Sequence, residues 1–112
     1  MTEPSIHVAR NDARGRYEIS VDGTVAGFTL IRDDDAGRVV LPHTEIDPAF
    51  SGRGLGGTLV AETLADLAAR GETAVPVCPF VVKYLRENEV PGLDVSWRPA
   101  ADDAGSDATD RP

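Results

Sequence analysis

The sequence predicts a single α+β domain, in which an antiparallel meander of strands is followed by a strand, a helix, a second strand and a second helix. Three observations lead to this prediction. Residues 6–46 alternate between apolar and polar positions, residues 53–70 repeat apolar residues at helical spacing, and a segment with four glycines joins these two regions. A chain of 112 residues can bury one modest core but not two.

The first half is expected to form four strands. Their predicted ranges are 6–10, 16–21, 24–31 and 38–46. Asp22-Gly23 is a strong hairpin signal between the second and third strands. Gly27 predicts a bulge or a close backbone approach within the third. Pro42 cannot donate a ladder hydrogen bond, so the fourth strand must lie at an edge or be bulged there.

A helix is predicted over residues 53–70. Its apolar residues recur at helical spacing and should form one buried stripe: Leu55, Leu59, Val60, Thr63, Leu64, Leu67 and Ala68. Asp66 and Arg70 are spaced for an ion pair one turn apart, and Gly71 suits the position just after the helix. We expect this helix to cross over to a strand at 73–77 that runs parallel to the fourth strand.

A second helix is predicted to begin at Pro79, which suits the first helical position, and to end near Asn88. Four of its side chains should share one face: Phe80, Val81, Tyr84 and Leu85. A final strand is expected over 93–97. Residues 99–112 are small, acidic and without periodicity, so we expect a domain at 1–98 and a disordered tail after it.

The formal net charge of −8 argues against a nucleic-acid or anionic-membrane partner. The chain has one cysteine, so no intrachain disulfide can form, which favours a reducing compartment. No basic leader precedes an apolar run at the N-terminus, and no segment reaches transmembrane length. A cytoplasmic protein is the expectation.

The glycines at positions 52, 54, 56 and 57 stand where the first helix begins. Glycine costs about 1 kcal/mol inside a helix, so four of them at its start need a reason. Without Cβ atoms the backbone amides of the first turn are accessible, and a helix N-terminus can then hold a phosphate or pyrophosphate. Arg53 could add positive charge. The alternative is a plain junction between a loop and a helix.

Two other glycine motifs fit less well. Gly52, Gly54 and Gly57 match the spacing of the dinucleotide fingerprint, but Cys78 ends the next strand where that motif needs an acidic residue. A Walker A loop needs a lysine before Thr58, and Gly57 stands there.

Four residues are candidates for chemistry. Alternation places His43 and Glu45 on one face of the fourth strand, where either could accept a proton; the alternative is a satisfied pair at a strand end. Cys78 precedes a helix N-terminus, which favours a thiolate, although a lone cysteine is more often a small core residue. By its residue type alone, Tyr84 is expected to be a core aromatic residue with its hydroxyl at the surface.

The chain resembles the GNAT superfamily of N-acetyltransferases, and in particular its short single-domain branch, often called the YjdJ-type or GNAT-like family. The segments that carry the resemblance are Asp22-Gly23 with Ala26-Gly27, His43-Thr44-Glu45, Gly52-Arg53-Gly54-Leu55-Gly56 and residues 75–84. The sequence departs from the family pattern in having Ser51 where Gln or Arg is usual, and Asn88-Glu89-Val90-Pro91 where His-Pro-Glu usually follows the second helix.

The resemblance implies a GNAT-like fold with a splayed pair of parallel strands at a cleft for acetyl-coenzyme A (acetyl-CoA). The cofactor-binding residues would be Ile46, Gly52, Arg53, Gly54, Leu55, Gly56 and Gly57. The resemblance also implies that Tyr84 protonates the leaving thiolate and that Cys78 faces the cofactor. The expected activity is transfer of an acetyl group to an amine by direct attack. The alternative is a CoA-binding module without significant turnover. The acceptor, small or protein, is not specified by the sequence.

Overall fold

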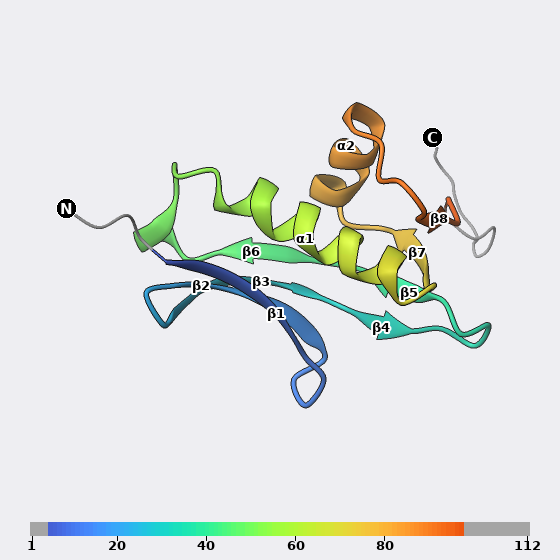
Figure 1. The fold of residues 1–112 in the computed structure, drawn as a ribbon, viewed down its shortest axis with the longest axis horizontal. Coiled ribbons are helices and arrows are strands. Elements are labelled where there is room, and N and C mark those ends of the chain that lie inside the picture. The colour runs from blue at the N-terminus through green and yellow to red at the C-terminus, as the bar shows by residue number, and fades with distance from the viewer. Residues whose placement is uncertain (1–4, 98–112) are drawn as a thin grey trace.

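The computed structural model describes residues 5–97, which form two four-stranded sheets and two α-helices (Figure 1). The mixed α+β architecture predicted from the sequence is confirmed. The acidic segment 99–112 lies outside the described residues, so its separation from the domain stays a prediction. Within the described part of the chain, no helix is both long and apolar enough to cross a membrane.

The first sheet is antiparallel and has the strand order β1-β2-β3-β6. Its strands are β1 (Ile6–Asn11), β2 (Arg16–Val21), β3 (Thr24–Leu30) and β6 (Thr44–Ile46). The second sheet has the order β4-β5-β7-β8. Its strands are β4 (Arg32–Asp33), β5 (Val39–Leu41), β7 (Thr73–Pro76) and β8 (Asp94–Val95). The helices are η1 (Pro48–Phe50), α1 (Leu55–Ala69) and α2 (Pro79–Glu87).

The prediction of one continuous strand over 38–46 is wrong, because this segment divides into β5 and β6. The Leu30 amide donates to the carbonyl oxygen of His43, whereas Arg32 pairs with Val40. Ile31 therefore lies opposite two residues, Leu41 and Pro42. One residue opposite two defines a β-bulge. Of the two possibilities expected at Pro42, an edge position or a bulge, the register agrees with a bulge, and the chain passes here from one sheet to the other.

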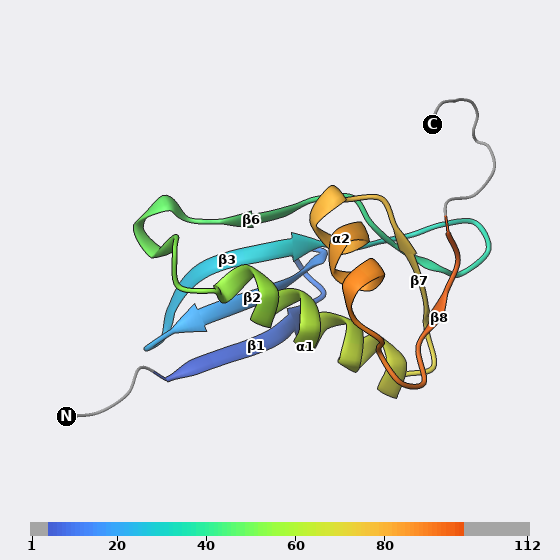
Figure 2. The ribbon, with the colours of Figure 1, turned by 90° about the horizontal axis from the view of Figure 1, so that it is seen from above.

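The parallel pairing expected across the first helix is confirmed. β5 runs parallel to β7, with Leu41 opposite Pro76. The Leu41 carbonyl oxygen then accepts hydrogen bonds from the amides of Val77 and Cys78, at 3.3 and 2.9 Å. Beyond this point β6 continues beside β3, while α2 follows β7 (Figure 2). The parallel strands β5 and β7 are thus splayed at their ends, because the chain after β5 follows β3 and the chain after β7 turns into α2. The point where these two paths separate is called the splay below.

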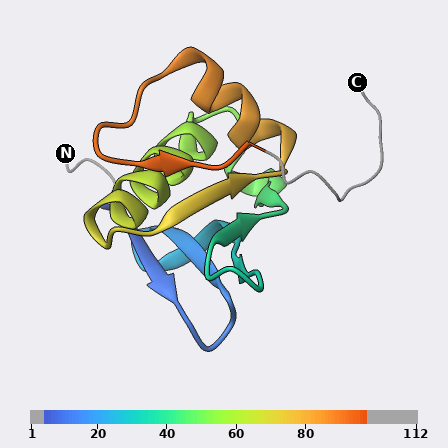
Figure 3. The same ribbon diagram turned by 90° about the vertical axis from the view of Figure 1, so that its right-hand side faces the viewer.

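Helix α1 lies across the first sheet and buries the predicted apolar stripe, except that Ala68 is only half-buried (Figure 3). It begins at Leu55 rather than at Arg53, because Gly54 adopts a left-handed conformation with φ +74°. It ends as expected. Gly71 has φ +72°, and the amides of Gly71 and Glu72 bond back to the carbonyls of Ala68 and Leu67.

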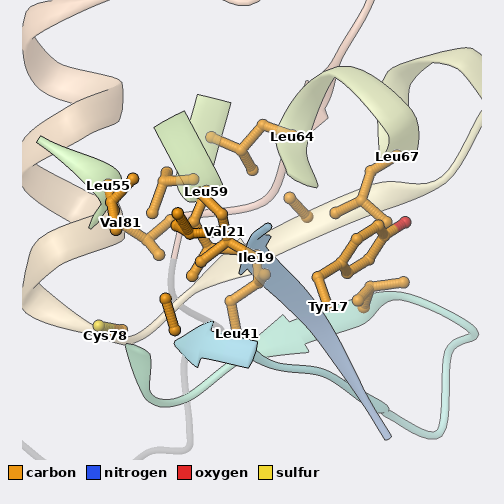
Figure 4. Close-up of a cluster of buried hydrophobic side chains, with 14 residues drawn as sticks. Tyr17, Ile19, Val21, Leu41, Leu55, Leu59, Leu64, Leu67, Cys78 and Val81 are labelled. Atoms are coloured by element: carbon orange, nitrogen blue, oxygen red, sulfur yellow. The ribbon is translucent and has the colours of Figure 1, made fainter. Parts of the chain in front are cut away.

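The core joins the inner face of the first sheet to α1, β5 and the start of α2 (Figure 4). Val81 is buried there, and Tyr84 and Leu85 pack against it, but Phe80 stays 45% exposed. Of the four side chains predicted to share one face of the second helix, three therefore contact the core, and Phe80 is largely exposed. β8 is shorter than the predicted strand over 93–97, and Trp97 is also largely exposed.

Tyr17 anchors β2 to α1. Its hydroxyl is in hydrogen-bond contact with Asp66, whose Oδ2 also pairs with Arg70 Nε at 2.6 Å, so the predicted Asp66–Arg70 pair is confirmed. Burial, followed by the bond to Asp66, raises the pKa of Tyr17 from 10 to about 12. Above pH 10 an unfolded chain loses this proton while the folded chain keeps it, so rising pH favours unfolding.

We therefore expect the free energy of unfolding to fall between pH 10 and about pH 12, and this decline to be shallower in Tyr17→Phe. At pH 8 the same variant should be less stable by about 1–2 kcal/mol, because Asp66 loses a hydrogen bond. Urea denaturation across this pH range measures both effects. An equally steep decline in Tyr17→Phe would show that another group causes it.

Candidate functional site

Among the residues that the structure describes, no side chain caps the N-terminus of α1. Gly54 occupies the cap position in the left-handed region, and Gly52 before it also has a positive φ of +79°. These two glycines make the turn possible, because other residues are strained there. A glycine cap leaves the amides of Leu55, Gly56 and Gly57 without a side-chain acceptor. The positive end of the helix dipole is thus open to an anion, and the binding of a phosphate there stays a prediction.

Gly56 also has a packing role that was not expected from the sequence. A Cβ atom at this position would lie 2.8 Å from Cζ of Phe80 and 3.7 Å from Cγ1 of Ile46. Gly56 therefore allows α1 to pack closely against Phe80 of α2, and the role predicted for its amide in cofactor binding stays a prediction. At Gly57, by contrast, an added Cβ atom would meet nothing within 4 Å.

A hollow of about 330 Å³ lies between α1 and α2. It is lined by Gly57, Phe80, Lys83, Tyr84 and Glu87. The structure therefore brings the predicted Tyr84 to the same hollow as the predicted Gly57. The amino group of Lys83 is 4.0 Å from the Glu87 carboxylate, and its side chain is 75% exposed.

Three residues of this hollow were not predicted as site residues from the sequence: Phe80, Lys83 and Glu87. Together with Tyr84 they follow the helical spacing of three, four and seven residues, so they share one face of α2. This helical spacing is the sequence signal from which the three residues could have been predicted. Arg53 is exposed beside the α1 N-terminus, with its guanidinium 5.3 Å from the centre of the Phe50 ring.

β6 is an edge strand of the first sheet, and its free edge faces the splay. The His43 carbonyl oxygen and the Asp47 amide bond to β3, so the ladder alternation directs the backbone groups of His43, Glu45 and Asp47 toward β3. The backbone groups of Thr44 and Ile46 consequently point away from β3. An extended ligand could pair with them as a further strand would.

His43 and Glu45 are brought together on the face of β6 that α1 does not cover. His43 Nε2 lies 3.1 Å from Glu45 Oε1, and the two side chains are 54% and 58% exposed. The His43 ring is also 6.3 Å, centre to centre, from the Phe28 ring. This pair can exchange a proton with a molecule that approaches from solvent.

Cys78 is placed differently from the other predicted site residues. It caps the N-terminus of α2 as expected, but its side chain is only 4% exposed and packs in the core cluster (Figure 4). Cys78 is not among the residues that line the hollow between α1 and α2. The buried thiol packs at the point where β7 ends and α2 begins.

Comparison with known families gives a match over residues 16–92 to the family described as GCN5-related N-acetyl-transferase. This match covers well over half of the 112 residues. The chain belongs to this family.

The chain is similar, at low identity, to proteins named NATD1 from several vertebrates. Protein NATD1 of Mus musculus is 28% identical over 87 residues, which are 77% of this chain and 79% of that protein. Protein NATD1 of Xenopus tropicalis is 27% identical over 88 residues, which are 78% of this chain and 81% of that protein. The human protein of the same name is 28% identical over 87 residues, 77% of each chain.

Among solved structures, the fold is similar to that of a ribosomal-protein-alanine N-acetyltransferase from Brucella melitensis biovar Abortus 2308. The TM-score is 0.50 and the identity 18%, over 77% of this chain and 66% of that one. The chain thus spans slightly less than two thirds of the length of that structure. At this identity the likeness establishes the fold alone.

Proposed function

We propose that the protein is an acetyl-CoA-dependent N-acetyltransferase of the short, YjdJ-type branch of the GCN5-related family. The observation that carries the proposal is the uncapped N-terminus of α1, which opens beside the hollow at Gly57 and near the free edge of β6. Family membership supports the proposal, because the family generally uses acetyl-CoA.

In this proposal the diphosphate of acetyl-CoA binds to the amides of residues 54–57, where the helix dipole favours negative charge. Arg53 and Lys83 are exposed cations near the two sides of the site and can neutralise further phosphate charge. The amide-containing arm of the ligand pairs with the backbone groups of Thr44 and Ile46. These contacts place the thioester in the splay beside β6.

The reaction is a direct transfer. The amine nitrogen attacks the thioester carbon, a C–N bond forms, and the C–S bond breaks with its electron pair leaving on sulfur. Glu45, paired with His43, accepts the proton that the amine loses, directly or through water. The hydroxyl group of Tyr84 protonates the leaving thiolate. The protein contributes positioning and proton transfer.

The rival function is a module that binds CoA without turnover. The two functions are separated by measuring thiol release from acetyl-CoA over a panel of primary amines, together with calorimetric titration of acetyl-CoA. Amine-dependent thiol release supports the transferase. Binding without release for any amine supports the module, and absence of binding contradicts both.

Substitution of Cys78 tests whether the acetyl transfer is direct or passes through a covalent intermediate on this thiol. If the thiol takes part, Cys78→Ala should fold and bind acetyl-CoA but lose turnover, and an acetyl adduct on wild-type Cys78 would indicate a covalent route. Intact mass spectrometry after incubation with acetyl-CoA detects that adduct. Full activity of Cys78→Ala would instead assign Cys78 to core packing, in keeping with its 4% exposure.

A further inference from the structure

Strand β6 pairs with β3 at its end nearest the splay without a backbone hydrogen bond between the facing residues (Figure 2). The facing residues are Thr29 and Thr44. The Leu30 amide donates to the carbonyl oxygen of His43, so the ladder alternation turns the backbone groups of Thr29 toward β2 and those of Thr44 away from β3. A side-chain contact is therefore the means by which these two residues can be joined.

The hydroxyl group of Thr29 supplies this contact. It lies 2.7 Å from the hydroxyl oxygen of Thr44 and donates to the carbonyl oxygen of His43 at 3.2 Å. Since the single proton of Thr29 goes to the carbonyl, the Thr44 hydroxyl is the donor in the shorter contact. Thr29 is fully buried, so water does not compete for either bond. One buried hydroxyl group thus joins two consecutive residues of β6 to β3.

The other end of β6 is also held close to β3. A Cβ atom added to Gly27 would lie 2.6 Å from the carbonyl oxygen of Glu45, a distance at which the strands would have to move apart. Gly27 therefore allows β6 to approach β3 closely at this end, while Thr29 fastens it at the end nearest the splay. Together the two contacts fix the position of the free edge of β6.

This edge borders the N-terminus of α1. The Cγ1 atom of Ile46 lies 3.7 Å from the place where a Cβ atom of Gly56 would stand. Thr44 is half-buried and shares this face of β6 with Ile46, because side chains two residues apart in a strand point the same way. The backbone groups of Thr44 and Ile46 that point away from β3 consequently lie beside the uncapped helix end.

We infer that Thr29 is a positioning residue for the acetyl-CoA site and that it acts through His43 and Thr44. The inference rests on the proposed function, in which the outward backbone groups of Thr44 and Ile46 pair with the amide-containing arm of the ligand. Without the Thr29 hydroxyl, fewer bonds hold the start of β6, and ligand binding must first order this edge, which weakens the affinity. Thr29 itself is buried and does not contact the ligand.

The test compares Thr29→Val, which exchanges the hydroxyl for a methyl group, with Thr29→Ser, which keeps the hydroxyl. Thr29→Val should raise both the KM and the dissociation constant for acetyl-CoA about fivefold, with kcat within about twofold, because the edge holds the ground state and the transition state alike. Thr29→Ser should keep the wild-type affinity within about twofold. An unchanged dissociation constant in Thr29→Val, or an equal loss in both variants, would overturn the inference.

Thr63→Val is the matched control. Thr63 lies on α1 and is 1% exposed, and among the residues that the structure describes its hydroxyl group has no hydrogen-bond partner. This variant therefore measures the effect of exchanging a buried hydroxyl for a methyl group without loss of a bond. It should keep the wild-type KM for acetyl-CoA. A rise in KM equal to that of Thr29→Val would contradict the inference.

Hydrogen exchange in the ligand-free, full-length protein separates this inference from the proposed function. The Leu30 amide donates to His43 across the pair of strands at 2.8 Å, so its exchange rate reports the opening of β6. This amide should exchange about fivefold faster in Thr29→Val than in the wild type or in Thr63→Val. Unchanged exchange would overturn the positioning role even if acetyl-CoA binds. Faster exchange in a protein that does not bind acetyl-CoA would confirm that Thr29 holds β6 and contradict the proposed function.

Discussion

Glu45→Gln should lower kcat for acetyl transfer by about 100-fold, the lower range for loss of a general base, while the affinity for acetyl-CoA stays unchanged. Glutamine keeps the shape of the side chain and its contact with His43 but cannot accept a proton from the incoming amine. The side chain is 58% exposed on the face away from α1, so it has no packing role to lose. Steady-state kinetics with a reactive amine, together with calorimetry for acetyl-CoA, separates the two parameters.

Glu62→Gln is the matched control, because Glu62 is an exposed carboxylate on α1 away from this face. It should leave kcat within about twofold, as expected for a surface substitution. A loss of less than threefold in Glu45→Gln would remove Glu45 from the proton-transfer step. The kcat of His43→Gln, measured in the same way, would then show whether His43 accepts the proton instead.

The second large effect concerns the hollow between α1 and α2. Gly57→Trp should weaken acetyl-CoA binding at least tenfold, about 1.4 kcal/mol, because the indole would occupy the hollow beside the helix N-terminus. An added Cβ atom at this position meets nothing within 4 Å, so the backbone of α1 tolerates a side chain here. Calorimetric titration measures the affinity.

Gly57→Ala provides the control at the same position. It should bind acetyl-CoA as the wild type does and be more stable by about 0.5–1 kcal/mol, since alanine is the better helix former. Unchanged affinity in Gly57→Trp, with the fold confirmed by circular dichroism, would show that the ligand does not use this hollow. Gly56 is unsuitable for this test, because a side chain there would collide with Phe80.

The elements with strong local signals were predictable from the sequence. The stripe of α1, its termination at Gly71 and the start of α2 at Pro79 all depend on residues within one or two helical turns. The division of residues 38–46 into β5 and β6 was not predictable in the same way. Pro42 marks the irregular position, but which sheet each half joins depends on pairing with β3 and β7, which lie far away in the sequence.

Contacts between segments far apart in the sequence also limited what could be predicted about the site. The facing of His43 and Glu45 follows from strand alternation, and the left-handed turn at Gly54 follows from its glycine. The packing role of Gly56 depends on Phe80, 24 positions later, which only the docking of α2 on α1 reveals. The near-complete burial of Cys78 likewise results from how β5, β7 and α2 meet, and local pattern left that outcome open.

In the proposed complex, the N-terminus of α1 and the free edge of β6 hold acetyl-CoA. The most direct measurement is a titration of ¹⁵N-labelled protein with acetyl-CoA, in which the backbone amide shifts are followed residue by residue. We expect the largest shifts at Gly54, Leu55, Gly56 and Gly57, with further shifts at Thr44 and Ile46. Saturable binding that leaves all six amides unperturbed would contradict it.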